Sequence, residues 1–487
     1  MAAPFKLAII GGGPSAFYAA SRVLSKLPKD LKNAHVHVYD RLWTPHGLVR
    51  YGVAPDHPEV KGYKTASLVN CTNKFDVTAL DLRFRFFGNV EIVPPEPTPM
   101  QTRTSATSRP LHLPLRSLAK HYTHLLLAYG SSTPVVPALS PDSLQPISAL
   151  DFVHWYTAHP NPHTKTGIPI DRLVNAKHIT VVGHGNVALD VARIILSSPS
   201  RLAPYDVPQS VLEVLNQLQI QHVSIVGRRA PAQVSFTAKE VREMMNLEGV
   251  GMRPIDPALF SLGAEGLSRQ QSRLIDLMRK GSSTLASSAA RTWSLDFLRS
   301  PLSISSSSVT YSINSLSPSL SAVPTSETVT IPTDLVIASV GYRSTPIHSA
   351  WYDTRLGRVR NVDGQVVRED GSIVRGVYAS GWAANGARGV LASTMWNAYA
   401  VAEKIVEDAT ASVIPDQKSI KDTHTEDDIT LAGEPGLPEA VSEASNVVVT
   451  YPEWKRIDAE EVRRGGEAWK ERERMSWVEV ADFLDKP

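Results

Sequence analysis

The sequence of 487 residues predicts an α/β protein with two parallel sheets, and three observations carry this prediction. A short apolar run, residues 7–10, ends in a glycine-rich turn that an alanine-rich helical pattern follows. The same order recurs at 179–196, and apolar runs at 335–338 and 376–379 precede a long helical pattern after Gly389. A strand, a glycine turn and a helix in this order form the βαβ unit of a dinucleotide-binding fold. Two such units predict two nucleotide sites.

The composition excludes several classes of protein. Lys+Arg 50 against Asp+Glu 48 leaves a formal net charge of +2, so overall charge gives no reason to expect a nucleic acid partner. No apolar run approaches the eighteen or so residues that a membrane-spanning helix needs. The single cysteine, Cys71, excludes an internal disulfide, a CxxC pair and a cysteine-rich metal or iron–sulfur site held by this chain alone. We predict no metal site. If the chain carries out redox chemistry, its electrons must pass to an acceptor outside the chain.

The first glycine turn is predicted to bind a dinucleotide. Gly11 allows the tight turn, and Gly13 lets the backbone approach a pyrophosphate, which then lies on the helix N-terminus. Asp40 follows the next predicted strand, residues 35–39, where an acid can accept hydrogen bonds from a ribose diol. A turn that serves only the structure is the alternative.

The second glycine turn, which contains His184 and Gly185, is followed by a different strand end. Arg228 and Arg229 come after the strand 222–226, where an NAD-specific unit usually carries an acid. Two guanidiniums suit a 2′-phosphate, so the pattern favours NADPH over NADH; a solvated basic turn is the alternative. A flavin dinucleotide in the first site and NADPH in the second is the economical assignment, because flavin accepts a hydride and passes on single electrons.

Three stretches have the composition of flexible loops. Residues 94–114 are rich in Pro, Thr and Ser, residues 303–330 in Ser, and residues 409–444 in acidic and polar residues. Such composition is predicted to build no core. The segment 200–220, with its prolines, is predicted to be an elongated connection within the second unit.

Long motifs then resemble a known family. The runs 45–58 and 183–193 closely resemble adrenodoxin reductases, the NADPH–ferredoxin reductases of mitochondria, and their bacterial relatives. Further matches lie at 227–229, 236–240, 297–301, 341–342, 380–382 and 454–461. The resemblance covers most of the chain outside the three loop stretches.

The resemblance implies a discontinuous FAD domain, residues 1–130 and 344–487, into which an NADPH domain, residues 131–343, is inserted. It implies FAD contacts at Ser15, Asp40, Leu48, Ile92, Trp382, Gly389, Val390 and Leu391. It implies NADPH contacts at His184, Gly185, Asn186, Val187, Arg228, Arg229, Glu240 and Gly389.

The family also implies residues for chemistry and for a partner. His57 and Asp190 match positions near the flavin, where they could steer protons or order water; alone, each fits equally well as a structural histidine or a helix acid. The implied partner is a small acidic [2Fe–2S] ferredoxin, docked by Lys239 and Arg242 on the helical pattern 238–245; a solvated helix face is the alternative. Mitochondrial localisation, in the matrix or at the inner membrane face, follows by resemblance. The start shows no presequence, so a cytoplasmic protein, or a mature or truncated imported form, stays open.

Three departures from the family pattern bear on activity. Asp40 stands where the family usually has Glu, one methylene longer. Residues 62–69 look inserted, and residues 383–388, Ala-Ala-Asn-Gly-Ala-Arg, replace a usual Lys-Arg-Gly-Pro-Thr. The last two could perturb the placement of flavin or nicotinamide. An NADPH oxidase or monooxygenase, or an inactive flavin-binding relative, therefore remain as alternatives to the ferredoxin reductase.

Overall fold

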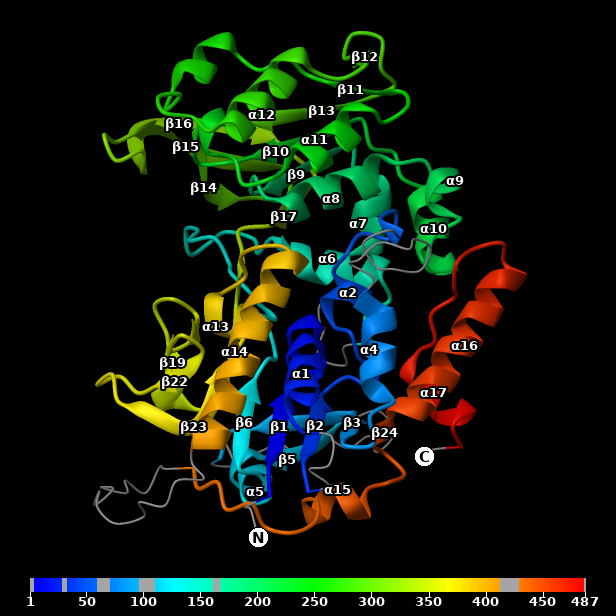
Figure 1. Ribbon diagram of the computed structural model, residues 1–487. Helices are drawn as coiled ribbons and strands as arrows, with labels where there is room; N and C mark the ends of the chain where they lie inside the picture. Colours follow the sequence, from blue (N-terminus) through cyan, green and yellow to red (C-terminus); the bar gives the residue numbers. More distant parts are fainter. Residues whose placement is uncertain are drawn as a thin grey trace.

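The computed structural model describes residues 4–28, 33–58, 71–95, 110–160, 167–411 and 429–485. The proposed insertion at 62–69 lies outside these ranges. Two sheets lie one above the other, each with helices packed against it, as Figure 1 shows. The lower sheet in that view takes strands from both ends of the chain, and the upper sheet takes strands from the middle. The predicted α/β class, with one Rossmann-like unit inserted into another, is confirmed.

The larger sheet has eight strands in the order β21-β22-β23-β6-β1-β2-β3-β24. Their bounds, in chain order, are β1 Lys6–Ile10, β2 His35–Asp40, β3 Phe84–Gly88, β6 His124–Leu127, β21 Asn361–Val362, β22 Gln365–Val367, β23 Ile373–Ala379 and β24 Val449–Thr450. The central five, β23 to β3, pair in parallel, while β24 joins the edge antiparallel to β3. Parallel strands put their carboxyl ends at one edge, which is where nucleotides bind in such folds.

Helices cover both faces of the larger sheet. One face packs against α1 Pro14–Lys26, α4 Cys71–Ala79, α14 Leu391–Ala411 and α16 Tyr451–Glu467. The other face packs against α5 Leu115–Ala119 and the strands β4 Val90–Val93 and β5 Leu111–Pro114. Apolar side chains fill both interfaces, so this sheet is buried on two sides as expected for parallel strands.

The smaller sheet has seven parallel strands in the order β12-β11-β13-β10-β9-β17-β8. Their bounds are β8 Ile147–Ser148, β9 His178–Val182, β10 His222–Val226, β11 Val250–Met252, β12 Thr284–Leu285, β13 Arg291–Asp296 and β17 Leu335–Ala338. The principal helices around it are α6 Ala149–Tyr156, α8 Asn186–Leu196, α11 Ala238–Met245 and α12 Arg269–Lys280. Where the chain crosses between the sheets, β7 Thr133–Pro134 pairs antiparallel with β18 Tyr342–Arg343.

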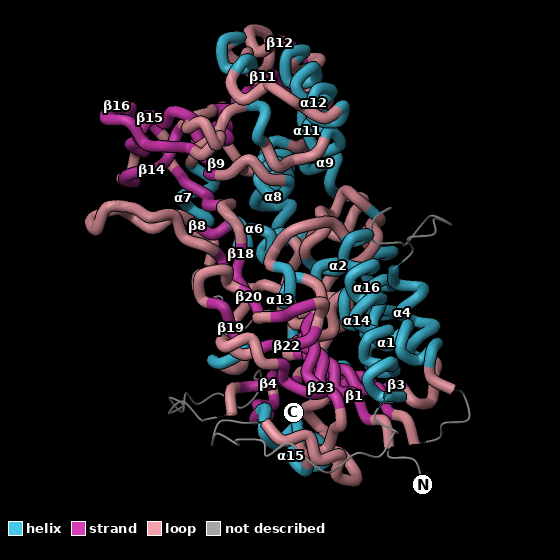
Figure 2. Tube along the Cα trace, turned by 60° about the vertical axis from the view of Figure 1, so that its left-hand side comes forward, coloured by secondary structure: helices cyan, strands magenta, loops and turns pink. Residues whose placement is uncertain are grey.

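The prediction that residues 303–330 form a loop without a core is wrong. β14 Arg299–Ile304, β15 Ser308–Leu316 and β16 Ala322–Pro332 form a three-stranded antiparallel sheet, drawn in magenta at the upper left of Figure 2. Ile304, Val309 and Tyr311 pack in an apolar cluster with one valine each from β9, β10 and β17. Serine and threonine alternate with apolar residues here, and that alternation suits a strand with one buried face better than a loop.

The other two loop predictions are wrong where the structure describes the stretches, because Leu113 and Val441 belong to the apolar cluster on the α5 face of the larger sheet. The segment 200–220, predicted to be an elongated connection within the second unit, lies between α8 and β10 and contains α10 Gln209–Asn216 after the short α9 Pro199–Leu202. Within 94–114 the described end forms β5, and within 409–444 the described end contains α15 Glu439–Glu443. Residues 96–109 and 412–428 of these two stretches lie outside the described residues.

Candidate active site

The first glycine turn joins β1 to α1 in a way that only glycine permits. Gly11 has a φ of +100°, and an added Cβ would lie 2.5 Å from the Cα of Tyr129. Gly13 precedes α1 and supplies no side-chain cap, and an added Cβ there would meet no atom within 4 Å. The first N–H groups of α1 are therefore left without a side-chain acceptor beside open space, which fits a pyrophosphate.

Asp40 directs its carboxylate back onto this turn. Its Oδ2 accepts a hydrogen bond from the Gly12 N–H at 2.5 Å, and its Oδ1 accepts one from the Leu42 N–H at 2.8 Å. Burial raises the pKa of Asp40 to about 6, although both bonds oppose the rise. The structure thus gives Asp40 a part in fixing the turn, and its contact with a ribose stays a prediction.

Three segments that are far apart in the sequence meet at the start of α1. The Ser15 hydroxyl donates to the Ser380 hydroxyl at 2.8 Å. The Asn397 side-chain oxygen, on α14, accepts from the Gly381 N–H at 2.8 Å and from the Ser380 hydroxyl at 3.1 Å. Gly381 has a φ of +65°, and an added Cβ would lie 2.7 Å from the Cβ of Ser15. The predicted flavin contact Ser15 is therefore held in place by the Ser380–Gly381 turn.

Leu48 and Ile92 occupy different surroundings. Leu48 begins the short α2 (Leu48–Tyr51) directly after Gly47, at which an added Cβ would lie 3.1 Å from the Cα of Gly13. The structure therefore places Leu48 near the first turn. Ile92 is only 8% exposed and belongs to the apolar cluster on the α5 face of the larger sheet.

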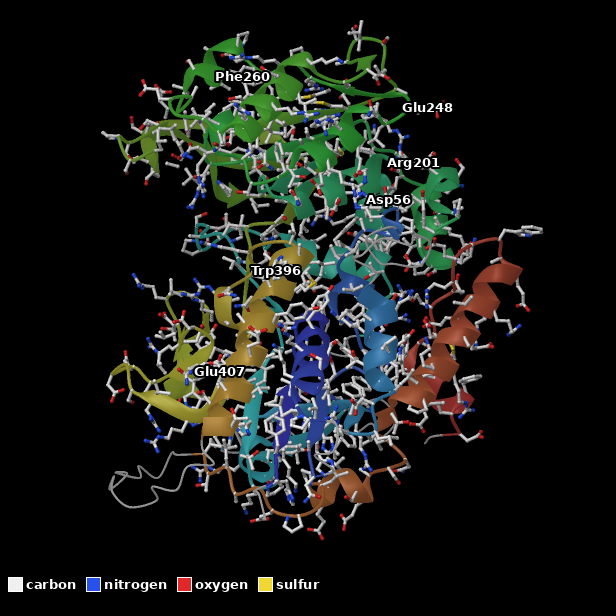
Figure 3. The ribbon with its side chains drawn as sticks, viewed as in Figure 1. Asp56, Arg201, Glu248, Phe260, Trp396 and Glu407 are labelled. Carbon is white, nitrogen blue, oxygen red and sulfur yellow. The ribbon has the colours of Figure 1, made fainter. Side chains whose placement is uncertain are left out.

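The remaining predicted flavin contacts lie around the start of α14. Trp382 stacks on Tyr342, with ring centroids 6.5 Å apart and an interplanar angle of 11°. Gly389 has a φ of +88°, Val390 is 59% exposed, and Leu391 begins the helix half-buried. Trp396, labelled in Figure 3, lies further along the same helix and is 67% exposed. This end of α14 therefore presents an exposed apolar surface, which the sequence patterns did not identify.

The second glycine turn repeats the geometry of the first. Gly183 has a φ of +134°, and an added Cβ would lie 2.1 Å from the main-chain oxygen of Ser339. Gly185 precedes α8 without a side-chain cap, and no atom lies within 4 Å of its added Cβ. Asn186 accepts a hydrogen bond from the Thr237 N–H at 2.9 Å, and Val187 is half-buried against the core. The start of α8 also fits a phosphate.

The His184 side chain packs beneath the turn. Its Nε2 lies 3.0 Å from the main-chain oxygen of Ile225 and donates to it, and its ring covers Gly227, where an added Cβ would lie 2.2 Å from Nδ1. Burial lowers the pKa of His184 to about 4, so the ring is neutral near pH 7. Its imidazole supports the strand end, and the backbone of the turn is the part that can approach a nucleotide.

Arg228 and Arg229 are exposed at the end of β10. Their main-chain oxygens are fixed by Asn314, at 3.0 Å, and by the Leu298 N–H, at 3.3 Å. Burial lowers the pKa of Arg229, and so do the positive charges of Arg228 and Arg388. Arg388 lies in the segment 383–388, which differs from the family pattern, and follows the crossing strand β18 in the chain. It therefore brings a third positive charge close to the Arg228–Arg229 pair.

The helix α11 carries the predicted Glu240, Lys239 and Arg242. Glu240 accepts a hydrogen bond from the Thr237 hydroxyl at the start of the helix. Lys239 is exposed and lies 3.9 Å from Glu243, measured from Nζ to Oε1, while Arg242 is half-buried. The two basic side chains therefore lie on a helix that also carries Glu243.

A cluster of charged side chains lies between the two sheets, and we call it the junction cluster: Asp56, His57, Asp190, Arg193 and Glu243. His57 Nε2 lies 2.7 Å from Glu243 Oε2. Arg193, on α8, donates two hydrogen bonds of 2.9 Å to Asp56 and one of 2.7 Å to Asp190, and its Nη1 lies 3.1 Å from Glu243 Oε2. Figure 3 shows Asp56 where the upper and lower parts of the molecule meet.

The Arg193 guanidinium sets the charge state of the junction cluster. Burial raises the pKa of Asp190, and Arg193 reduces that rise. Burial also raises the pKa of Asp56 and Glu243, but Arg193 and His57 more than offset the effect, so both pKa values fall below the ordinary range. The pair predicted from the sequence, His57 and Asp190, is thus joined through Arg193 and Glu243.

Sequence reasoning missed Asp56, Arg193 and Glu243 as site residues. Asp56 and Arg193 lie inside the two runs that resemble the family, and Glu243 follows Lys239 by one helical turn. On a helix, Asp190 and Arg193 read as an ordinary surface pair at i and i+3. The missing information was burial, because the Arg193 side chain is 0% exposed.

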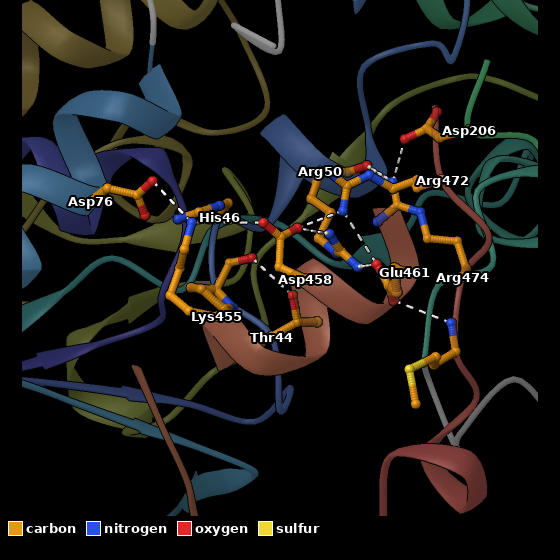
Figure 4. Close-up of polar contacts among 12 residues, drawn as sticks. Thr44, His46, Arg50, Asp76, Asp206, Lys455, Asp458, Glu461, Arg472 and Arg474 are labelled. Atoms are coloured by element: carbon orange, nitrogen blue, oxygen red, sulfur yellow. Dashed lines mark hydrogen bonds and ion pairs between the residues drawn. The ribbon is translucent and has the colours of Figure 1, made fainter. Parts of the chain in front are cut away.

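A second ionic network holds the loop that carries Gly47 and Leu48, and Figure 4 shows its members. Arg50 is paired with Glu461 on α16, and Arg472 donates to Asp458 at 2.5 Å. Arg474 donates to Asp206 at 2.5 Å, which ties the C-terminal segment to the part of the chain between α9 and α10. The network connects the two parts of the molecule on the side away from α14.

Two Rossmann-like units, each with an uncapped helix behind a glycine turn, define the class of oxidoreductases that use two nucleotides. In the described ranges no helix is long and apolar enough to cross a membrane, and no group of three or more His, Cys, Asp or Glu could hold a metal ion.

Comparison with known proteins identifies the family. The chain is 34% identical over 481 residues to the mitochondrial NADPH:adrenodoxin oxidoreductase of Drosophila melanogaster, covering 97% of this chain and 92% of that protein. The human counterpart is 34% identical over 497 residues, with 96% and 90% covered. The structure of Mycobacterium tuberculosis FprA in complex with NADPH matches with a TM-score of 0.80 at 30% identity, covering 98% of this chain and 99% of that one. No protein-family model matches the chain. The chain belongs to the NADPH:adrenodoxin oxidoreductase family.

Proposed function

We propose that this protein transfers electrons from NADPH through FAD to a ferredoxin of the [2Fe–2S] type. The observation that carries the proposal is the pair of uncapped glycine turns on two sheets, with the buried junction cluster between them. Relatives at 34% identity are named NADPH:adrenodoxin oxidoreductase, and FprA has been solved with NADPH. Those relatives are named mitochondrial, which supports the same localisation for this protein.

The two helix N-termini and the arginine pair suit the phosphate groups of the two cofactors. The turn 11–13 and the N-terminus of α1 would hold the FAD pyrophosphate, with Ser15, Asp40, Leu48, Trp382 and the start of α14 around it. The start of α8 would hold the NADPH pyrophosphate, and Arg228 and Arg229 would hold its 2′-phosphate. When bound, FAD supplies the exchange of a two-electron hydride for single electrons. With these contacts we propose the domain boundaries at 130/131 and 343/344, beside the paired strands β7 and β18.

The junction cluster handles protons in this proposal. His57 Nε2 and Glu243 Oε2 share one hydrogen bond, so a proton can be held at either atom. Arg193 and His57 lower the pKa values of Asp56 and Glu243 more than burial raises them, so both carboxylates stay ionised near pH 7. The burial of Arg193 and Asp56 excludes water from one side of the cluster.

Docking of ferredoxin is proposed at Lys239 and Arg242. Positive side chains on α11 complement an acidic partner, and such pairing mainly increases the association rate at low salt. Lys239→Gln with Arg242→Gln should slow ferredoxin reduction several-fold at low salt and leave NADPH-driven reduction of a small neutral dye unchanged. An equal slowing of both reactions would place these side chains at the NADPH site instead.

The proposed function is tested by comparing two acceptors. The purified flavoprotein with NADPH should reduce a [2Fe–2S] ferredoxin, and its oxygen consumption should be slower by a wide margin. Oxygen consumption without ferredoxin reduction at any ionic strength would favour an oxidase. A yellow protein that NADPH does not reduce would favour an inactive flavin-binding relative.

A further inference from the structure

A cavity of about 380 Å³ opens at the amino-terminal edge of the larger sheet. It lies at the ends of β1, β2 and β3 that are remote from the glycine turns, at the bottom of Figure 1 near the marked N-terminus and α15. Its lining includes Lys6, His35, His37, Arg85, His121 and Tyr122. This volume is within the range of small-molecule sites.

Strand register brings the basic side chains together. Lys6 pairs with His35 across β1 and β2, and His37 pairs with Arg85 across β2 and β3. Side chains two residues apart on a strand lie on the same face, so His35 and His37 share the face of Lys6 and Arg85. Further along this face the sheet is apolar, with Ala8 and Phe87 in the core. The change from apolar to basic residues at the strand ends gives the cavity a positive wall.

The positive charge of this wall is not balanced within the described chain. Lys6 Nζ donates to the main-chain oxygen of Glu434, which is uncharged, and Arg85 makes no hydrogen bond or ion pair with a described residue. No aspartate or glutamate is among the described residues that line the cavity. The Glu434 side chain is exposed and lies outside that lining.

His37 adds a buried donor or acceptor that lacks a partner. Its Nδ1 lies 2.7 Å from the Tyr122 hydroxyl, and its Nε2 has no hydrogen-bond partner in the described part of the chain although the residue is only 6% exposed. Burial, together with the smaller effects of His35, Arg85 and Lys6, lowers the pKa of His37 to about 3. An unpaired buried polar atom is costly, and a bound ligand that accepts a hydrogen bond would remove that cost.

We propose that this cavity binds the phosphate group of a small phosphomonoester, held by Lys6, Arg85 and His37. The guanidinium and ammonium supply charge-assisted hydrogen bonds, and the imidazole supplies the buried donor. Pro4 and Leu437 form apolar parts of the rim that the rest of the ligand would contact. The site is separate from the Arg228–Arg229 pair, which belongs to the smaller sheet.

Calorimetric titration of the full flavoprotein tests the proposal, with inorganic phosphate and glycerol 3-phosphate as probes. Saturating NADP⁺ is present so that the Arg228–Arg229 site is filled. Arg85 is exposed, so Arg85→Gln should not disturb the fold. Both Arg85→Gln and Lys6→Met should weaken, at least about tenfold, the binding of whichever probe binds the natural protein more tightly. Arg201→Gln, an exposed arginine on α9, is the matched control and should bind as the natural protein does.

The titrations distinguish the two kinds of ligand from each other, and they also show whether the cavity binds phosphate at all. Equal affinity for both probes would assign the site to phosphate itself, and tighter binding of glycerol 3-phosphate would assign it to esters. Binding that persists in Arg228→Gln/Arg229→Gln would support a site apart from the NADPH site. Absence of binding at millimolar probe, or equal binding by Arg85→Gln and Arg201→Gln, would overturn the proposal. The visible spectrum and its change with NADPH should be the same in every variant outside residues 228–229, so the result does not depend on the proposed reaction.

Discussion

Replacing Arg193 with methionine is the perturbation that tests the junction cluster most severely. The Arg193 side chain is 0% exposed, and Asp56, Asp190 and Glu243 are 4%, 15% and 24% exposed. Methionine keeps much of the volume but removes the guanidinium. Three carboxylates would then lie close together, and the nearest remaining fixed positive charge would be Lys239, whose Nζ is 3.9 Å from Glu243 Oε1.

The magnitude follows from the burial of these groups. Removing one partner from a buried ion pair costs about 3–5 kcal/mol, because it leaves unpaired charge in a poorly solvated site. The partial exposure of Asp190 and Glu243 points to the lower end, about 3 kcal/mol. A loss of that size lowers the midpoint of the thermal transition by roughly 6–12 °C.

The pH dependence of this loss has a definite sign. Asp56 and Glu243 have folded pKa values below the ordinary range, so their stabilisation is present above their unfolded pKa values and is lost as pH falls through the folded ones. Without Arg193 these carboxylates would be stabilised by protonation instead. The deficit of the variant should therefore be largest near pH 8 and should shrink toward pH 4.

Thermal unfolding followed by tryptophan and flavin fluorescence is the assay. Arg193→Lys, which keeps the charge but not the paired hydrogen bonds to Asp56, should give an intermediate loss. Arg201→Gln should leave the midpoint unchanged. A midpoint for Arg193→Met within 2 °C of the natural protein, a shift of about 1 kcal/mol or less, would refute the reasoning, and so would a deficit that does not vary with pH.

Three further predictions concern the cofactor sites. Arg228→Gln/Arg229→Gln should weaken NADPH at least about tenfold more than NADH, because charge-assisted bonds to the 2′-phosphate are lost; equal losses in a fluorescence titration would contradict the assignment. Arg388→Ala should raise the KM for NADPH roughly fivefold and leave that for NADH unchanged, and unchanged KM values would mean that Arg388 does not reach the phosphate. Asp40 has a folded pKa of about 6, above its unfolded value, so the folded state binds more protons between about pH 4 and 6 and stability falls as pH rises through that window. Asp40→Asn should flatten that fall in a pH series of thermal midpoints, and an unchanged slope would show that Asp40 is not the group responsible.

Local patterns were sufficient for the elements around the nucleotide turns. The strand at 222–226 and the helix at 238–245 lie at the bounds found in the structure, and the strands at 7–10 and 35–39 differ by one residue at one end. Alternation, helical periodicity and glycine turns are properties of neighbouring residues, so one sequence is enough to reveal them.

Properties that depend on distant contacts could not be predicted in the same way. An arginine three residues after Asp190 on a helix suggests a surface ion pair. Only the packing of α8 against residue 56 and α11 shows that Arg193 is buried. Asp40 fits a ribose contact by its position, yet the fold turns its carboxylate onto Gly12. The basic cavity arises from the register between strands, Lys6 with His35 and His37 with Arg85, which no local pattern encodes.

An anaerobic spectral titration tests the central claim most directly. The purified protein should be yellow, NADPH should bleach its flavin absorbance, and an added [2Fe–2S] ferredoxin should restore that absorbance while the ferredoxin becomes reduced. Arg228→Gln/Arg229→Gln should need far more NADPH for the same bleaching. A protein that binds no flavin, or a bleached flavin that ferredoxin never reoxidises at any ionic strength, would contradict the account.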